Sequence, residues 1–247
     1  MNDSSTGVVR LCYRVETAAG EDYDPSVMAV GTLGCFSYRI QDRIATLVPV
    51  PTLAAAADAH ALLDPLVAGW NVHALLSLGP GAFQLRHLHT VVAPKGTAEP
   101  CSHAARTDGA TAGALLIHTH YPAAPADMLA DNDVLALAEE YARLLREPRR
   151  LVLAGRAAVQ LLERRFVDRR AAADALNSDL RVLNKLAEIT STWGRRTGAE
   201  KITTWKSTRR VTKAEREWIV DVLRALTRRL AQQAAGVRPA ETMSRLP

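Results

Sequence analysis

The segment from Thr190 to Arg210 holds the residues best suited to contact a charged polymer: two tryptophans and six Lys or Arg side chains around one glutamate. The cations can neutralise phosphate groups, and the indole rings can stack on unpaired bases. The pattern predicts a nucleic-acid-binding surface formed by Trp193, Arg195, Arg196, Lys201, Trp205, Lys206, Arg209 and Arg210. The alternative is a polar connector whose indoles fold back onto the protein, because tryptophan is usually well buried.

The preceding segment, residues 170–189, has the pattern of two helices joined by a tight turn. A short alanine-rich helix reaches Asn177, which tolerates the left-handed backbone of a turn, and Ser178 is a suitable N-cap for a second helix. The outer face of that helix would present Arg181, Asn184, Lys185 and Glu188. Arginine and asparagine read guanine and adenine edges well, so a DNA-recognition helix is one interpretation. Helix pairs of this kind are also common corners of bundles that have no DNA role.

Four histidines form two alternating pairs, His87 with His89 and His118 with His120, each in a predicted strand. Alternate residues of a strand point to the same face. If the two strands were neighbours, the four imidazoles would converge on a metal ion such as zinc. The alternative is a partly exposed, histidine-bearing sheet face, because neither strand contains an Asp or Glu that would orient the imidazoles.

Few other residues suggest chemistry. The chain has no histidine after His120 and no cysteine after Cys101, so its second half lacks imidazole and thiolate groups for catalysis. It contains neither of the common phosphate-binding glycine loops and no GxSxG nucleophile motif. We therefore assign no catalytic residue, expect no cofactor, and favour a protein that is not an enzyme.

The composition predicts a soluble cytoplasmic protein with no membrane contact. The chain has 247 residues and 48% apolar residues, enough for one large or two small cores, and its Ala- and Arg-rich composition is typical of a high-GC bacterium. Cys12, Cys35 and Cys101 are odd in number and widely spaced, which favours a reducing compartment over a disulfide framework. We find no secretory leader and no continuous apolar run of about 18 residues.

The charge is divided unevenly along the chain. Residues 1–130 carry 7 Lys or Arg against 11 Asp or Glu, whereas residues 131–247 carry 24 against 15. The second half is therefore strongly basic, as expected of a surface that meets nucleic acid or an acidic protein. Arginine-rich helices that are simply solvated would give the same counts.

The hydrophobic period also changes between the halves. In the first half, one helix is predicted at residues 53–69, kinked or divided by Pro65, with turns at Asp42 and at Gly79-Pro80-Gly81, the latter a hairpin. Strands rich in β-branched residues are predicted at 8–15, 27–40, 43–50, 71–78, 83–92 and 113–121.

From Asp131 onward the apolar residues recur with a helical period. Asp131 or Asn132 is a suitable N-cap, Pro148 separates two helices, and Thr212 begins the last helix with a capping box. The tail after Gly236 is predicted to fray. We therefore predict an α+β protein, with a strand-rich domain at 1–125 that contains one helix, and a basic helical bundle at 126–247.

Several stretches together are similar to a family of uncharacterised bacterial proteins. They read ADAHALLDPLVAGWNVHALLSLGPGAFQLR, then HYPAAPADMLADNDV, LNKLAEITSTWG and KAEREWIVDVLRALTRR. The resemblance covers most of the chain after Leu53 and implies a shared two-part layout. It carries no activity, cofactor or site residue.

These patterns favour a non-catalytic binding protein whose basic helical domain engages nucleic acid or an acidic protein partner. The alternative is an enzyme or metal-binding protein that uses the histidine-bearing sheet face of the N-terminal domain. The sequence leaves the oligomeric state open.

Overall fold

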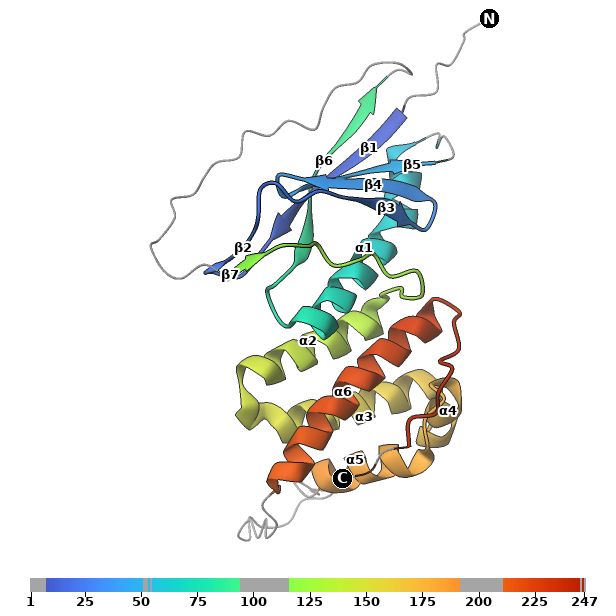
Figure 1. Cartoon of the computed structure of the whole chain (residues 1–247). Coiled ribbons are helices and arrows are strands. Elements are labelled where there is room, and N and C mark those ends of the chain that lie inside the picture. Colours follow the sequence, from blue (N-terminus) through green and yellow to red (C-terminus); the bar gives the residue numbers. More distant parts are fainter. Residues whose placement is uncertain are drawn as a thin grey trace, which may run out of the picture. The chain divides into compact units, whose positions relative to one another are not determined.

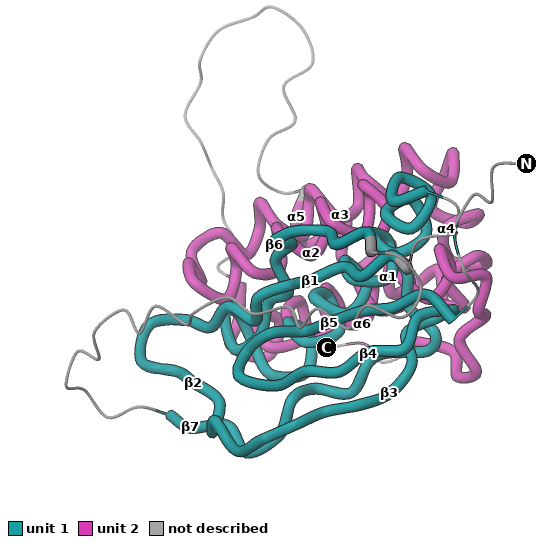
Figure 2. The backbone as a smooth tube through the Cα atoms, turned by 90° about the horizontal axis from the view of Figure 1, so that it is seen from above, with its two compact units in different colours: residues 1–129 teal, residues 130–247 magenta. Residues whose placement is uncertain are grey.

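The computed structural model describes residues 8–50, 53, 55–93, 116–191, 211–244 and 246. The chain is α+β, as predicted: an antiparallel sheet with one helix is followed by a set of helices (Figure 1). Two compact units divide it, Met1–Leu129 and Ala130–Pro247 (Figure 2). The boundary between the two units falls after Leu129, whereas we predicted a domain boundary after Pro125. That each domain folds independently stays a prediction.

The first unit contains one five-stranded antiparallel sheet and one separate parallel pair of strands. The sheet is built from β1 (Val8–Glu16), β3 (Ala29–Leu33), β4 (Phe36–Gln41), β5 (Ile44–Pro49) and β6 (Gln84–Ala93). Its strand order is β3-β4-β5-β1-β6. The pair joins β2 (Glu21–Tyr23) to β7 (Leu116–His118).

The segment 27–40, predicted as one strand, forms a hairpin instead. Strand β3 ends at Leu33 and β4 begins at Phe36, with Gly34 between them at φ +57°. Glycine adopts this left-handed backbone without strain, so the chain reverses there. The turn predicted at Asp42 is present, and both Asp42 and Arg43 have positive φ.

Helix α1 (Ala56–Leu78) is longer than predicted, and Pro65 does not divide it. The strand predicted at 71–78 and the hairpin at 79–81 are wrong, because residues 71–78 belong to α1 and Gly79 ends it at φ 98°. One face of α1 packs into the core of the sheet through Ala59, Leu63, Val67, Trp70 and Ala74. Burial of this face offsets the backbone hydrogen bond missing at Pro65 and holds the whole length helical.

Two polar side chains fix α1 to the segments beside it. The Asn71 amide donates to the carbonyl of Leu85 and accepts from its N–H, at 3.1 and 2.7 Å, which attaches the helix to β6. The indole of Trp70 donates to the Pro122 carbonyl at 3.1 Å.

By length and composition, α1 is the one helix in the described part of the chain that could cross a membrane. Core helices of soluble proteins have the same composition, and eight residues of α1 are buried within the protein.

The second unit consists of helices whose ends carry the predicted caps. They are α2 (Asn132–Arg146), α3 (Leu151–Phe166), α4 (Arg169–Ala175), α5 (Leu180–Ser191) and α6 (Lys213–Ala234), with a short 3-10 turn, η1 (Pro148–Arg150), before α3. Asp131 caps α2, and Thr212 forms a capping box with Glu215 at the start of α6. Asn177 has φ 48°, as the predicted turn between α4 and α5 requires.

The C-terminal tail is held in place over most of its length, contrary to the predicted fraying. The Met243 N–H donates to the Asn177 carbonyl at 3.0 Å, and the Met243 carbonyl accepts from the Asp179 N–H at 2.8 Å. Asn177 also donates to the Pro239 carbonyl at 2.9 Å, and Arg229 donates to the Glu241 carbonyl at 2.8 Å. The tail thus supplies acceptors to the turn between α4 and α5, which satisfies backbone groups at the start of α5.

The cysteines differ from the expectation of free thiols. Cys12 is disulfide-bonded and fully buried, whereas Cys35 is a free thiol.

Deleting residues 237–247 should destabilise the protein by about 1–3 kcal/mol, because Arg229, Asn177 and the Asp179 N–H lose partners at a partly buried site. Urea unfolding followed by far-UV circular dichroism measures the change. A matched deletion of residues 245–247 leaves these bonds intact and should cost less than about 0.5 kcal/mol. Equal stability of the two truncated proteins would show that the tail bonds contribute nothing.

Candidate functional site

The four predicted metal ligands do not meet. Strand β6, with His87 and His89, pairs with β1, whereas β7, with His118, pairs with β2 in the other sheet. His120 lies beyond the end of β7, and β6 and β7 are not neighbours, whereas convergence of the four imidazoles on one ion requires neighbouring strands. Among the described residues no group of three or more His, Cys, Asp or Glu side chains is arranged to hold a metal ion.

His87 and His89 also fail to share a face, because β6 contains a bulge. His87 pairs with Tyr13 and His89 pairs with Cys12, so Leu88 is an extra residue opposite β1. Tyr13 and Cys12 are consecutive, and consecutive residues of a strand point to opposite faces. Cross-strand partners lie on the same face. The extra residue therefore sends the two imidazoles to opposite sides of the sheet.

His118 is held by a carboxylate that sequence reasoning missed. Its Nε2 atom lies 3.0 Å from Glu21 Oε2, and its ring lies against that of Tyr23, with centroids 5.1 Å apart. Tyr23 in turn stacks on Tyr121 at 4.2 Å. His120 is exposed, and its Nδ1 contacts the Thr119 hydroxyl at 2.9 Å. Because His118 pairs with Glu21 and packs against Tyr23, its contacts resemble those of a structural residue.

His87 belongs instead to a polar cluster between α1 and β6, the Thr90 cluster, which consists of Tyr13, His60, Asp64, His87 and Thr90. The Thr90 hydroxyl contacts His60 Nε2 at 2.8 Å and His87 Nε2 at 3.1 Å. Asp64 Oδ1 lies 3.3 Å from His60 Nδ1 and accepts from the Tyr13 hydroxyl at 3.3 Å. The two imidazole rings are in edge contact, with centroids 4.7 Å apart.

Burial and charge act on the ionisable groups of this cluster. Burial, and then the carboxylate of Asp64, raise the pKa of the Tyr13 hydroxyl, which stays a hydrogen-bond donor. Partial burial, followed by the neighbouring His60, lowers the pKa of His87. The one signal in the sequence is the spacing of His60 and Asp64, four residues apart beside the buried stripe of α1. No sequence pattern links this pair to Thr90, because Thr90 lies in β6 and contacts His60 only where α1 packs on the sheet.

The outer face of α5 presents the predicted residues, each with a nearby partner. The Arg181 guanidinium donates to Asp179 at 2.7 and 2.9 Å, Asn184 accepts from Arg169 at 3.3 Å, and Lys185 pairs with Glu188 at 3.2 Å. Asp179 accepts from the Arg181 N–H, so Asp179 occupies the capping role predicted for Ser178.

The start of α5 is also occupied. The Asp179 N–H bonds to the Met243 carbonyl of the tail, and a recognition helix uses that end to approach base edges. Both features favour the bundle-corner interpretation of α4 and α5.

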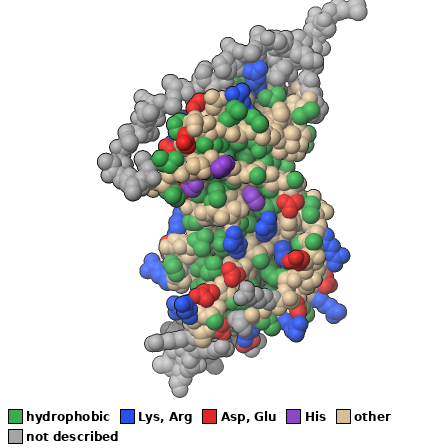
Figure 3. Space-filling view, viewed as in Figure 1, with side chains coloured by type: hydrophobic (Ala, Val, Ile, Leu, Met, Phe, Trp, Pro, Cys, Tyr) green, Lys and Arg blue, Asp and Glu red, His purple; other side chains and the backbone are tan. Residues whose placement is uncertain are grey.

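The described part of the bundle is close to charge balance. Its residues, 131–191 with 211–244, carry 17 Lys or Arg against 14 Asp or Glu. On the surface seen in Figure 3, the two signs are interspersed over the bundle. The segment 192–210 carries six Lys or Arg against one Glu. Most of the positive excess of the second half therefore lies in this segment, whose residues are outside those described: Trp193, Arg195, Arg196, Lys201, Trp205, Lys206, Arg209 and Arg210.

Both flanks of that segment attach to one end of the bundle. A Cβ placed on Gly155, in the first turns of α3, would lie 2.7 Å from Thr190 Cγ2 in α5 and 3.7 Å from Ile219 Cγ2 in α6. Only glycine allows so close an approach. The end of α5 and the first turns of α6 therefore both pack near Gly155 of α3.

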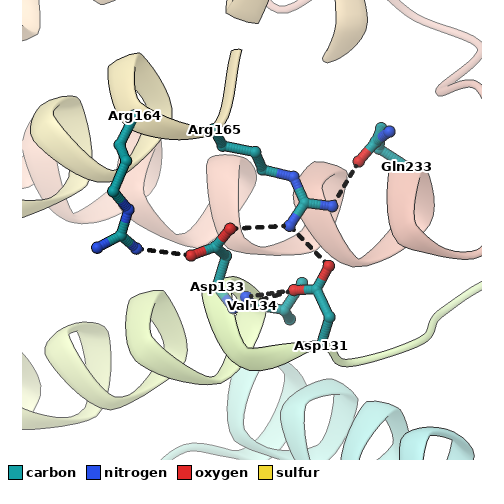
Figure 4. Close-up of polar contacts among 6 residues, drawn as sticks. All are labelled: Asp131, Asp133, Val134, Arg164, Arg165 and Gln233. Atoms are coloured by element: carbon teal, nitrogen blue, oxygen red, sulfur yellow. Dashed lines mark hydrogen bonds and ion pairs between the residues drawn. The ribbon is translucent and has the colours of Figure 1, made fainter. Parts of the chain in front are cut away.

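At the opposite end of the bundle, the arginines bind carboxylates and link helices (Figure 4). Arg165, near the end of α3, donates to Asp131 at 2.6 Å, to Asp133 at 3.2 Å and to Gln233 of α6 at 2.9 Å. Arg164 donates to Asp133 at 2.7 Å. Arg165 thus links α2, α3 and α6, and Arg164 adds an ion pair between α2 and α3.

No protein-family model matches the chain, and no curated protein or solved structure matches it. The family resemblance expected from the sequence therefore stays a prediction.

The Asp131 carboxylate should make the bundle sensitive to acid. Burial raises the pKa of Asp131. Hydrogen bonds from the N–H groups of Val134 and Asp133 and from the Arg165 guanidinium lower it by more, so its pKa in the folded protein lies below the ordinary 3.8. A carboxylate whose pKa is lower in the folded state contributes stability above its unfolded pKa and loses it as the pH falls. The wild type should therefore lose part of its stability below about pH 4 through this residue.

The substitution D131N keeps an oxygen that caps α2 and removes the charge that binds Arg165. We expect D131N to be less stable than the wild type at pH 7, with the difference shrinking between pH 4 and pH 2. Urea midpoints at pH 7, 4 and 3 measure this. A difference that is the same at all three pH values would show that the Arg165 ion pair contributes nothing to stability.

Proposed function

We propose that this chain is a non-catalytic binding protein whose basic helical unit engages nucleic acid through the end of the bundle that carries residues 192–210. The observation that supports this proposal is the distribution of charge. The folded helices are nearly balanced and use many of their arginines in ion pairs, whereas the segment between α5 and α6 holds a surplus of five positive charges. A surplus concentrated in one short segment is what binding to a row of phosphates requires.

The attachment of the segment adds to this support. It lies between α5, where Thr190 is buried, and the capping box of Thr212 at the start of α6, so a packed helix holds each of its flanks. Anchoring both ends reduces the conformational entropy that binding must remove. Trp193 and Trp205 would add stacking on unpaired bases, which makes a single strand the preferred ligand.

An acidic protein surface is the other polyanion that fits the same charge. The remaining alternative, an enzyme or metal-binding protein that uses the histidine-bearing face, no longer rests on four converging imidazoles. Its support is now the Thr90 cluster of the first unit.

Replacing Arg195, Arg196, Arg209 and Arg210 by alanine should weaken binding to all nucleic-acid sequences alike. For each phosphate that the protein no longer neutralises, the slope of log affinity against log salt should fall by about 0.7 on a single strand and about 0.9 on a duplex. Fluorescence anisotropy of labelled oligonucleotides over a salt series measures both. The matched control replaces Arg170, Arg224, Arg228 and Arg238, which are exposed and outside the ion pairs that hold the bundle. This control removes the same charge and should leave the salt slope unchanged.

Substituting Trp193 or Trp205 by alanine should cost roughly 1–3 kcal/mol of binding to a single strand if the indole stacks on a base. A lower melting temperature with unchanged affinity would identify the indole as a buried anchor instead. Wild-type protein that binds neither strand form at low salt would refute the nucleic-acid proposal. Retention of the same protein on an acidic polypeptide would then identify the acidic partner.

A further inference from the structure

The face of the five-stranded sheet that points away from α1 collects the arginines of the first unit. Successive residues of a strand alternate between the two faces, and cross-strand partners share a face. The α1 side holds core residues such as Leu11, Ile40 and Leu47. The residues that alternate with them lie on the opposite face, named here the outer face. Among the described residues of this sheet, the charged side chains on the outer face are Arg10, Arg14, Glu16, Arg39 and Arg86.

This placement separates charge within the first unit. Its described residues carry five Arg against eight Asp or Glu, so the unit is acidic on balance. Four of these five arginines nevertheless lie on the outer face, with one glutamate. The fifth, Arg43, lies in the turn between β4 and β5 and pairs with Asp22 at 3.3 Å. The outer face therefore carries a surplus of three positive charges within an acidic unit.

Two of the arginines are direct cross-strand partners. Arg14 of β1 is paired with Arg86 of β6. Like charges that face each other directly across two strands destabilise a sheet. Glu16 offsets part of this cost, because its carboxylate lies 3.4 Å from Arg86. Arg14 is exposed and has no ion pair among the described residues, so an anion held between the two guanidinium groups would remove the repulsion that remains.

We propose that the outer face is a second surface for nucleic acid, on which Arg14, Arg39 and Arg86 neutralise backbone phosphates. The inference rests on the proposed function and extends it from the helical unit to the sheet. All three arginines are exposed. A guanidinium group matches the geometry of a phosphate and binds it through two parallel hydrogen bonds.

The other side chains of the outer face favour the nucleic-acid backbone as the ligand. Thr46 lies opposite Arg39, and Thr32 lies opposite Ser37, so hydroxyl groups that can contact phosphate and sugar surround the arginine. Protein interfaces centre on aromatic anchors, and bases stack on aromatic rings. The imidazole of His89 is the one ring that the described strands place on this face. We therefore expect the outer face to bind duplexes and single strands alike, without sequence preference.

Fluorescence anisotropy of the full-length chain with labelled duplex and single-stranded oligonucleotides tests the inference. The triple variant R14Q/R39Q/R86Q should lower the affinity for both at least about tenfold at low salt. The slope of log affinity against log salt should fall by up to about 2 on a single strand and about 2.7 on a duplex. The matched control R170Q/R224Q/R228Q removes the same charge from exposed positions of the helical unit and should bind like the wild type. E16Q removes the carboxylate of the outer face and should tighten binding.

The single variant R14Q distinguishes a lost contact from lost folding. Because it removes the like-charge pair, it should raise the melting temperature while it weakens binding. A lower melting temperature for R14Q would contradict the repulsion between Arg14 and Arg86.

The inference is overturned if the triple variant binds both oligonucleotides as the wild type does. It is also overturned if the triple variant loses affinity for polyglutamate alone, because the outer face would then bind an acidic protein. In either case, loss of nucleic-acid binding on replacing Arg195, Arg196, Arg209 and Arg210 would leave the proposed function standing. Binding that survives replacement of those four arginines and is lost in the triple variant would support the outer face and contradict the role of residues 192–210. Wild-type protein that binds neither strand form would refute both.

Discussion

Packing of one face of α1 on the five-stranded sheet determines most of what is distinctive in the first unit. The apolar stripe from Ala59 to Ala74 is buried along its whole length, so the helix continues through Pro65 where local preference would break it. The same packing lets Asn71 fix the backbone at Leu85, which places β6 beside the helix. His60 and Asp64 then lie on the flank of the stripe, where His60 contacts Thr90 and Asp64 contacts Tyr13. The Thr90 cluster is thus a consequence of how the core is closed.

A single extra residue in β6 has an equally large effect on chemistry. The bulge at Leu88 reverses the side of the sheet on which following residues lie, so His87 joins His60 while His89 points the other way. Without it, the alternating pair would share a face. An inserted residue in a strand therefore decides which imidazole of the His87 and His89 pair faces α1.

In the second unit, charge has two separate uses. Arg165 and Arg169 bind carboxylates and connect helices, so they count toward stability and not toward an external surface. The surplus lies in the segment between α5 and α6, residues 192–210. The net charge of a domain is therefore a poor guide to its binding surface until the ion pairs within it are known.

The sequence by itself determined the features that depend on neighbouring residues. The α+β class, the caps at Asp131 and Thr212 and the left-handed turn at Asn177 follow from local hydrogen bonds and backbone preferences, and the structure has all of them. Tertiary structure alone decided the helical state of residues 71–78, the strand partners of β6 and β7, and the docking of the tail on Asn177. It also decided the meeting of His60, His87 and Thr90. The physical reason is that burial and hydrogen bonds between residues distant in sequence outweigh local propensity, and a single sequence does not reveal which distant residues will meet.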